Sequence, residues 1–309
     1  MTAFSFNGSD FVFVWWALLY EALPFVVVGA VLSGVLERCV SRETVVRLFP
    51  KNRLVGIAAS ACVGLLFPMC ECGIVPVVRR LVRKGVPVSC GVAYMLASPV
   101  INPVVMLSTF VAFYGKGDWK VMGIRVGLAY LVAVAVGLVI WKLFGEEHVL
   151  LPEQREPGDA EHDEHAHQGN VILEILGHAA DDFLVIGSTL VVGAGLAALI
   201  NSGFNRSAME PFADNPLTAV AGMSLLAVAL NLCSEADAFV AASFYAFPLA
   251  AKMAFLVLGP MLDLKLLAMY MTVFRPRAIV VISGLVAALV FLLGISGYFW
   301  MPDVISSGG

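Results

Sequence analysis

Two thiols and a carboxylate stand together in the segment FPMCECGIVPVVRRLVRKG, which covers residues 67–85. Thiolates bind soft ions, and a carboxylate within a membrane is costly unless it is paired, which marks it as a functional candidate. Pro68 and Pro76 flank the triplet Cys70, Glu71, Cys72 and indicate a non-helical backbone, which at membrane depth must be covered by protein or by a water-filled cavity. The triplet therefore predicts a site. An alternative to a functional site is that both cysteines are small side chains that pack inside a helix.

A second group of reactive side chains follows in NLCSEADAF, at the end of another apolar run; these residues are Cys233, Ser234, Glu235 and Asp237. Ser and Asp favour helix caps, which accounts for Ser234 and Asp237 but not for the thiol. If a pseudo-twofold axis relates the two halves of the chain, this thiol would join the two thiols of the first triplet. Three thiols suit a thiophilic metal or metalloid.

Further polar residues interrupt apolar segments. Asn102 lies in LASPVINPV and Asp263 in LVLGPMLDLK, and the prolines of both segments should break a helix. Asn102 contacts the solute or caps a helix, while Asp263 either pairs with Lys265 or couples transport to protons. Glu21 interrupts the first apolar segment and is a candidate coupling group, together with the glutamates of the two cysteine motifs.

These groups must be positioned by membrane helices. The chain has 309 residues, of which 60% are hydrophobic and 14% charged, whereas soluble domains carry about 25% charged residues. Eight apolar segments are each near or above the ~20 residues that cross a bilayer, and they cover residues 11–36, 54–76, 86–114, 121–144, 182–201, 215–236, 244–273 and 278–300. The sequence therefore predicts an all-α, multi-pass protein in the lipid bilayer of the cell inner membrane. Residues 1–10 carry no Lys or Arg, so no signal peptide is expected.

Several functional classes are excluded by what the sequence lacks. The formal net charge of −4 offers no basic face for nucleic acid. The sequence shows no nucleophile–base–acid arrangement, no phosphate-binding loop and no Walker motif, so we expect neither an enzyme nor a bound cofactor.

An acidic, His-rich linker, residues 145–170, separates a first membrane repeat (1–144) from a second (171–309). Its composition buries too little apolar surface to fold by itself. His162, His165 and His167 stand among acidic residues and predict weak metal binding. A solvated acidic linker without bound metal is an alternative of equal weight.

The two halves resemble each other. One ungapped register superimposes Cys72 on Cys233, Pro87 on Pro248, Pro99 on Pro260, Asn102 on Asp263 and Phe113 on Phe274, and a second register pairs Gly29 with Gly187. We therefore predict two tandem four-segment repeats whose second and third segments are broken at Pro or Gly. Corresponding breaks in both halves of a transporter point to a transport site near the middle of the membrane.

The distribution of Lys and Arg bears on topology. If all segments cross, the basic residues divide with only a weak bias between the two sides. If the second and third segments of each half are re-entrant hairpins, most basic residues share one face, which the positive-inside rule favours. In that arrangement both termini and the linker lie outside.

The motifs PMCECGIVPV, LASPVINPV and LCSEADAFVAASF, in this order, resemble those of the ArsP/YraQ-like predicted permease family. The resemblance covers both repeats and implies a membrane permease. It also implies that Cys70, Cys72 and Cys233 are the thiols that meet the substrate. Some members of this family export trivalent organoarsenicals, and others are associated with thiophilic metals.

The leading interpretation is a secondary transporter for a thiophilic metal, a metalloid or a thiol-containing solute. Protons are the expected coupling ion, because a carboxylate or thiolate that loses a bound cation in an apolar site gains a proton. One alternative is a membrane thiol oxidoreductase that uses Cys70 and Cys72. Another is a structural subunit of a membrane complex, and the sequence leaves open a homo-oligomer or a membrane partner protein.

Overall fold

The computed structural model describes residues 8–39, 41, 43, 50, 52–115, 118–143, 149–151, 171–203 and 215–301. These residues form helices and connecting turns without a named β-strand, which confirms the all-α prediction. The elements are α1 (Gly8–Cys39), α3 (Arg53–Cys62), the 3-10 turn η1 (Val63–Leu65), α4 (Glu71–Arg83), α5 (Val88–Ala97), α6 (Pro103–Ala112), α7 (Asp118–Leu143), α8 (Val171–Gly203), α9 (Pro216–Leu230), α10 (Asp237–Ser243), α11 (Leu249–Met261), α12 (Leu264–Tyr270) and α13 (Pro276–Trp300). Most of the linker, including the three candidate histidines, lies outside the described residues.

Five stretches in the described part of the chain are long and apolar enough to cross a membrane: Gly8–Cys39, Trp119–Leu143, Ile175–Ser202, Leu249–Tyr270 and Pro276–Phe299. Shorter apolar helices lie between them. The protein is therefore a multi-pass membrane protein, as the sequence predicts.

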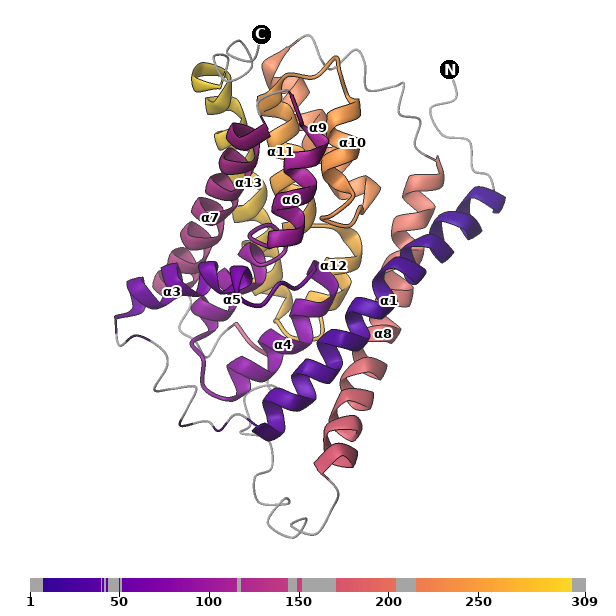
Figure 1. The fold of residues 1–309 in the computed structure, drawn as a ribbon, viewed down its shortest axis with the longest axis vertical. Coiled ribbons are helices and arrows are strands. Elements are labelled where there is room, and N and C mark those ends of the chain that lie inside the picture. Colours follow the sequence, from indigo (N-terminus) through magenta and orange to yellow (C-terminus); the bar gives the residue numbers. More distant parts are fainter. Residues whose placement is uncertain are drawn as a thin grey trace.

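Helices α1 and α8 form a long antiparallel pair on one side of the molecule (Figure 1). The Trp15 indole near the start of α1 donates to the Val191 carbonyl in the second half of α8, at 3.2 Å. Near the end of α1, a Cβ atom at Gly34 would lie only 2.6 Å from the Ile175 carbonyl oxygen of α8. The backbones therefore approach closely, as small residues allow in membrane helices.

A buried ionic cluster fixes this pair against α4. The Asp182 carboxylate of α8 accepts from the Ser33 hydroxyl of α1 at 2.6 Å and from Arg80 Nε of α4 at 3.1 Å. Arg80 Nη1 also lies 3.5 Å from Glu37 Oε2 of α1. Arg80, near the basic end of α4, therefore joins α4 to both α1 and α8.

The interruptions fall close to the predicted positions, but their details differ. Cys70 has an extended backbone, whereas Glu71 and Cys72 form the first turn of α4, which continues through Pro76. The expectation of a non-helical backbone is thus wrong for Glu71 and Cys72, because the helix starts one residue after Cys70. Helix α11 also continues through Pro260, and the chain breaks at Leu262 and Asp263.

The second and third segments of each half behave differently. In Figure 1, α3 and α4 lie in the lower part of the molecule and α9 and α10 in the upper part, so each second segment folds back on itself. The third segments, α5–α6 and α11–α12, continue through their breaks toward the opposite end. A proline break interrupts hydrogen bonding without reversing the chain.

This arrangement corrects the topology expected from the basic residues. Helix α1 begins at the upper end of Figure 1, near the N-terminus, whereas α8 begins at the lower end. Because the two halves start at opposite ends, the placement of both termini and the linker on one face is wrong. Pro87 and Pro248 precede α5 and α11, and Asn102 and Asp263 cap α6 and α12, positions that the ungapped register pairs. The tandem repeat itself stays a prediction.

Candidate functional site

A buried ion pair lies at the centre of the candidate site. Lys265 Nζ donates to Glu71 Oε1 at 3.1 Å, and the Ser234 hydroxyl donates to Glu71 Oε2 at 3.2 Å. The Glu71 side chain is 1% exposed and that of Lys265 3%. The first turn of α4, the start of α12 and the connection between α9 and α10 therefore meet at one carboxylate.

The break before α12 determines where the lysine lies. Asn231, at the end of α9, has a left-handed backbone (φ 50°), and its Oδ1 accepts from the amides of Leu264 and Lys265 at 2.9 and 3.3 Å. The Asp263 carboxylate accepts from the Leu266 amide at 2.6 Å, as an N-cap does. Asp263 also lies 3.5 Å from Lys265 Nζ. The carboxylate thus both caps the helix and pairs with the lysine.

The three predicted thiols are buried around this ion pair. Cys70 and Cys72 are both buried, at the N-cap and in the first turn of α4, on either side of Glu71. The Cys233 thiol donates to Glu235 Oε2 at 2.6 Å, and the Lys265 ammonium lies within electrostatic range of both Cys72 and Cys233. The structure therefore places both cysteine motifs around one ammonium.

Glu21 belongs to the same region. This residue is on α1, and although its side chain is exposed on the isolated chain, its carboxylate is within hydrogen-bonding reach of the Cys233 thiol. It is also within electrostatic range of Glu71, Glu235 and Lys265. The coupling role of Glu21 stays a prediction.

Asp237 has a partner that the sequence analysis missed. Arg125 on α7, 1% exposed, donates through Nη2 to Asp237 Oδ2 at 2.6 Å and through Nη1 to the Thr109 hydroxyl of α6 at 2.7 Å. The same Nη2 lies 3.5 Å from the Ser234 carbonyl. The sequence did show an arginine within an apolar segment. It could not show the partner of this arginine, which is 112 residues away in the chain.

Asn102 takes the role of a helix cap. Its Oδ1 accepts from the Val104 amide at 2.9 Å, at the start of α6. This is the capping alternative that the sequence raised, and a contact with solute stays a prediction. Within the described residues, no three His, Cys, Asp or Glu side chains are grouped so as to hold a metal ion.

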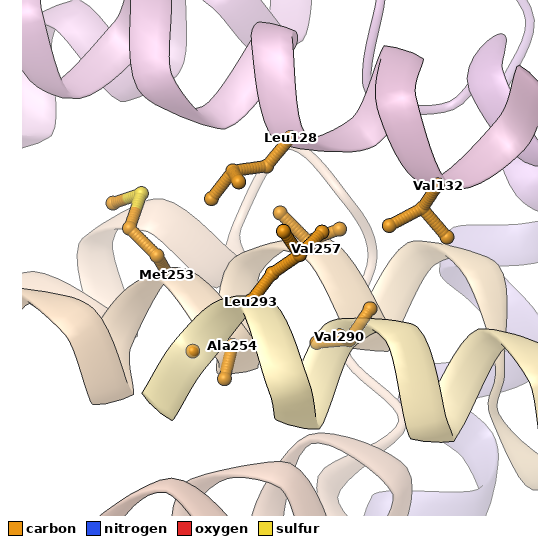
Figure 2. Close-up of a pocket in the computed structure, with 8 residues that line it drawn as sticks. Leu128, Val132, Met253, Ala254, Val257, Val290 and Leu293 are labelled. Atoms are coloured by element: carbon orange, nitrogen blue, oxygen red, sulfur yellow. The ribbon is translucent and has the colours of Figure 1, made fainter. Parts of the chain in front are cut away.

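A small apolar pocket lies away from these polar groups (Figure 2). Its cavity volume is only about 10 Å³, and it lies between α7, α11 and α13; its lining residues are Leu128, Val132, Met253, Ala254, Val257, Val290, Leu293 and Gly294. Because it contains neither a thiol nor a charged side chain, it offers nothing to bind an ion.

Two known proteins are similar to this chain along most of its length. The chain is 38% identical over 291 residues to UPF0718 protein YcgR of Bacillus subtilis (strain 168), covering 93% of this chain and 95% of that protein. It is 36% identical over 269 residues to a Streptococcus mutans protein named putative two-component membrane permease complex subunit, covering 87% of this chain and 88% of that protein.

A third relative, UPF0718 protein YraQ of Escherichia coli (strain K12), is 21% identical over 132 residues, covering 43% of this chain and 37% of that protein. No solved structure matches the chain. The ArsP_1 family, described as predicted permease, matches residues 10–297. The chain therefore belongs to the ArsP_1 family of predicted permeases, and it is a membrane permease with two cysteine motifs buried around one lysine.

Proposed function

We propose that this permease transports a thiophilic metal ion, a metalloid or a thiol-containing solute, and that Cys70, Cys72 and Cys233 contact it. The observation that carries the proposal is the burial of all three thiols around the Glu71–Lys265 pair, at the junction of α4, α12 and the α9–α10 connection. Soft ligands in a site with adjoining carboxylates suit soft ions. Interrupted helices at membrane depth are the usual place for such a site in secondary transporters.

The thiol contribution is tested by binding and flux measurements on the purified full chain. The probes are Cd(II) and the neutral thiol reagent phenylarsine oxide, applied to the wild type and to Cys70→Ser, Cys72→Ser and Cys233→Ser. We expect each of the three substitutions to lower affinity for both probes by about tenfold or more, which is about 1.4 kcal/mol. Cys90→Ser is the matched control, because Cys90 is also buried but lies on α5 outside both motifs. An equal loss in Cys90→Ser would contradict a site made by the motif thiols.

Proton coupling follows from the contact between Cys233 and Glu235. A thiol must lose its proton to ligate a soft ion, and the Glu235 carboxylate, 2.6 Å from the Cys233 sulfur, can receive it. We expect Glu235→Gln to abolish the response of flux to a pH gradient in proteoliposomes while binding at the other thiols is retained. An unchanged response would exclude Glu235 as the coupling group.

A thiol oxidoreductase is the second candidate, because Cys70 and Cys72 are two buried free thiols only two residues apart. If this activity were the function, Cys70→Ser and Cys72→Ser would abolish thiol–disulfide exchange in membranes while Cys233→Ser would not. The name of the Streptococcus mutans relative also raises the proposal of a second membrane subunit. Stoichiometric co-purification of a second membrane protein from the native host would support it.

A further inference from the structure

The Lys265 ammonium has more carboxyl groups around it than its single positive charge can balance. Its Nζ is 3.1 Å from Glu71 Oε1, 3.5 Å from Asp263 Oδ2 and 3.4 Å from the Asn231 carbonyl oxygen. Glu21 and Glu235 lie around Cys233, in the same region. Carboxyl groups therefore outnumber the ammonium, so this region electrostatically favours further positive charge.

The buried base Arg125, which also contacts the connection between α9 and α10, does not change this balance. Arg125 is paired at 2.6 Å with its own carboxylate, Asp237. Its remaining contacts are the Thr109 hydroxyl and the Ser234 carbonyl oxygen, which carry no net charge. Lys265 thus supplies the positive charge next to the Cys-Glu-Cys motif.

Lysine suits a charge that has to move. Its ammonium is a compact point charge on a flexible stem, whereas an arginine holds its partner with a planar fork. Lys265 also stands in the first turn of a helix of seven residues that follows a break in the chain. Its ammonium can therefore leave Glu71 by rotation of its own side chain, without movement of a long helix.

We propose, resting on the function proposed above, that Lys265 is a tethered competitor of the transported ion. Its ammonium occupies the position beside Glu71 when the site is empty, and a positively charged soft ion displaces it on binding at the thiols. Return of the ammonium then helps to release the ion, because two positive charges cannot share one buried carboxylate at low cost. Lys265 therefore lowers the affinity of the site for soft cations and speeds their release, and it leaves the affinity for neutral thiophilic solutes unchanged.

The test compares a charged and a neutral thiophile on the purified full chain. Replacing Lys265 by Met should increase the affinity for Cd(II) by about tenfold or more, which is about 1.4 kcal/mol. Release of Cd(II) should slow by a similar factor, while the affinity for phenylarsine oxide stays within about twofold, a difference of about 0.4 kcal/mol. Lys142→Met is the matched control, since Lys142 is exposed in the last turn of α7; it should leave both affinities unchanged.

A second pair of variants keeps the proposal testable if Lys265→Met fails to fold. Glu71→Gln should weaken Cd(II) binding, because the ammonium then repels the ion without a carboxylate to hold it. Adding Lys265→Met to Glu71→Gln removes both buried charges and should recover at least part of the lost Cd(II) affinity.

Three results would overturn the role of Lys265. They are unchanged or weaker Cd(II) binding in folded Lys265→Met, equal tightening for both probes, and no recovery in the double variant. If Cys72→Ser still weakens the binding of both probes in these experiments, the proposed thiol site is retained and only the competitor role of Lys265 is rejected. Failure of the wild type to bind either probe would overturn both proposals.

Discussion

Two of the buried ion pairs of this permease, Arg125–Asp237 and Lys265–Glu71, differ in what they connect. Arg125 joins three parts of the chain: it bonds Thr109 on α6, the Ser234 carbonyl and the Asp237 carboxylate at the start of α10. Lys265 pairs with Glu71 at a longer 3.1 Å and is surrounded by the motif thiols. Arg125 has the short bonds of a structural anchor, at 2.6 and 2.7 Å. The contacts of Lys265 are longer, at 3.1 to 3.5 Å, as suits a group that can be exchanged.

The difference shows that burial alone does not identify a functional charge. Both bases are almost fully covered, at 1% and 3% exposure. Their side-chain chemistry and their neighbours distinguish them, since a planar guanidinium holds several acceptors at once and an ammonium is a single mobile charge. Four experiments, in order of expected effect, test this distinction and the roles of the elements around the site.

The largest effect should come from Arg125→Met. This change leaves the Asp237 carboxylate buried without its partner, and Asp237 Oδ1 already has no hydrogen bond among the described atoms. We expect a loss of about 3–5 kcal/mol in the free energy of unfolding, measured by thermal or denaturant unfolding of the detergent-purified protein. Lys265→Met should cost less, because the Ser234 hydroxyl still bonds Glu71.

Adding Asp237→Asn should restore part of the stability that Arg125→Met loses. If Lys265→Met proved at least as destabilising as Arg125→Met, the assignment of anchor and exchangeable pair would be reversed.

A smaller loss is expected from Gly29→Ala on α1. A Cβ atom there would lie 2.5 Å from the Gly73 carbonyl oxygen and 2.8 Å from the Gly73 Cα, both backbone atoms of the first turn of α4. Overpacking of this kind costs about 1–3 kcal/mol, and it should shift Glu71 relative to Lys265 and weaken Cd(II) binding.

Gly187→Ala is the matched control for Gly29→Ala. The second sequence register pairs these glycines, but a Cβ atom at Gly187 meets nothing closer than 3.9 Å. Equal losses of stability in the two variants would mean that the contact between α1 and α4 does not matter.

Asn102→Ala separates capping from solute contact. Loss of the cap on α6 should cost about 1 kcal/mol of stability and leave the affinity for both probes unchanged. A clear loss of binding with that modest loss of stability would instead assign Asn102 to the solute. Stability and binding are measured on the same preparation, so the two effects are directly comparable.

The smallest effect is expected from the linker. Replacing residues 153–169 by a Gly/Ser sequence of equal length should leave stability, binding and flux unchanged, because a polar, charged composition buries little apolar surface. Neither ion pair includes a residue from this segment. If flux alone were lost, the histidines would be a loading site for the transported ion.

The sequence predicts the local features of this molecule and misses the long-range ones. The apolar segments, the breaks, and the capping potential of Asn102 and Asp263 depend on neighbouring residues, so composition and proline positions reveal them. Lys265 was visible as a charge in an apolar segment, but its contact with Glu71 spans 194 residues. A pair at that separation depends on how α4 and α12 pack, which no local pattern specifies.

The predicted topology was wrong for a related reason. Hydropathy measures whether a segment is apolar and does not show whether it turns back or continues at its break. The α3–α4 segment, which turns back, and the α5–α6 segment, which continues, both contain an interruption. Only the packed structure shows this difference in direction.

Two backbone hydrogen bonds join the segment after α7 to the second half of the chain. The Leu151 amide donates to the Val273 carbonyl at 3.2 Å, and the Arg275 amide donates to the Val149 carbonyl at 2.9 Å. The chain that leaves α7 is thereby joined to the turn before α13, while α1 packs along α8. A protease cut within residues 153–169 should therefore give two fragments on a denaturing gel that still migrate as one particle in detergent. We thus expect the separated halves to associate as the two subunits of a heterodimer do.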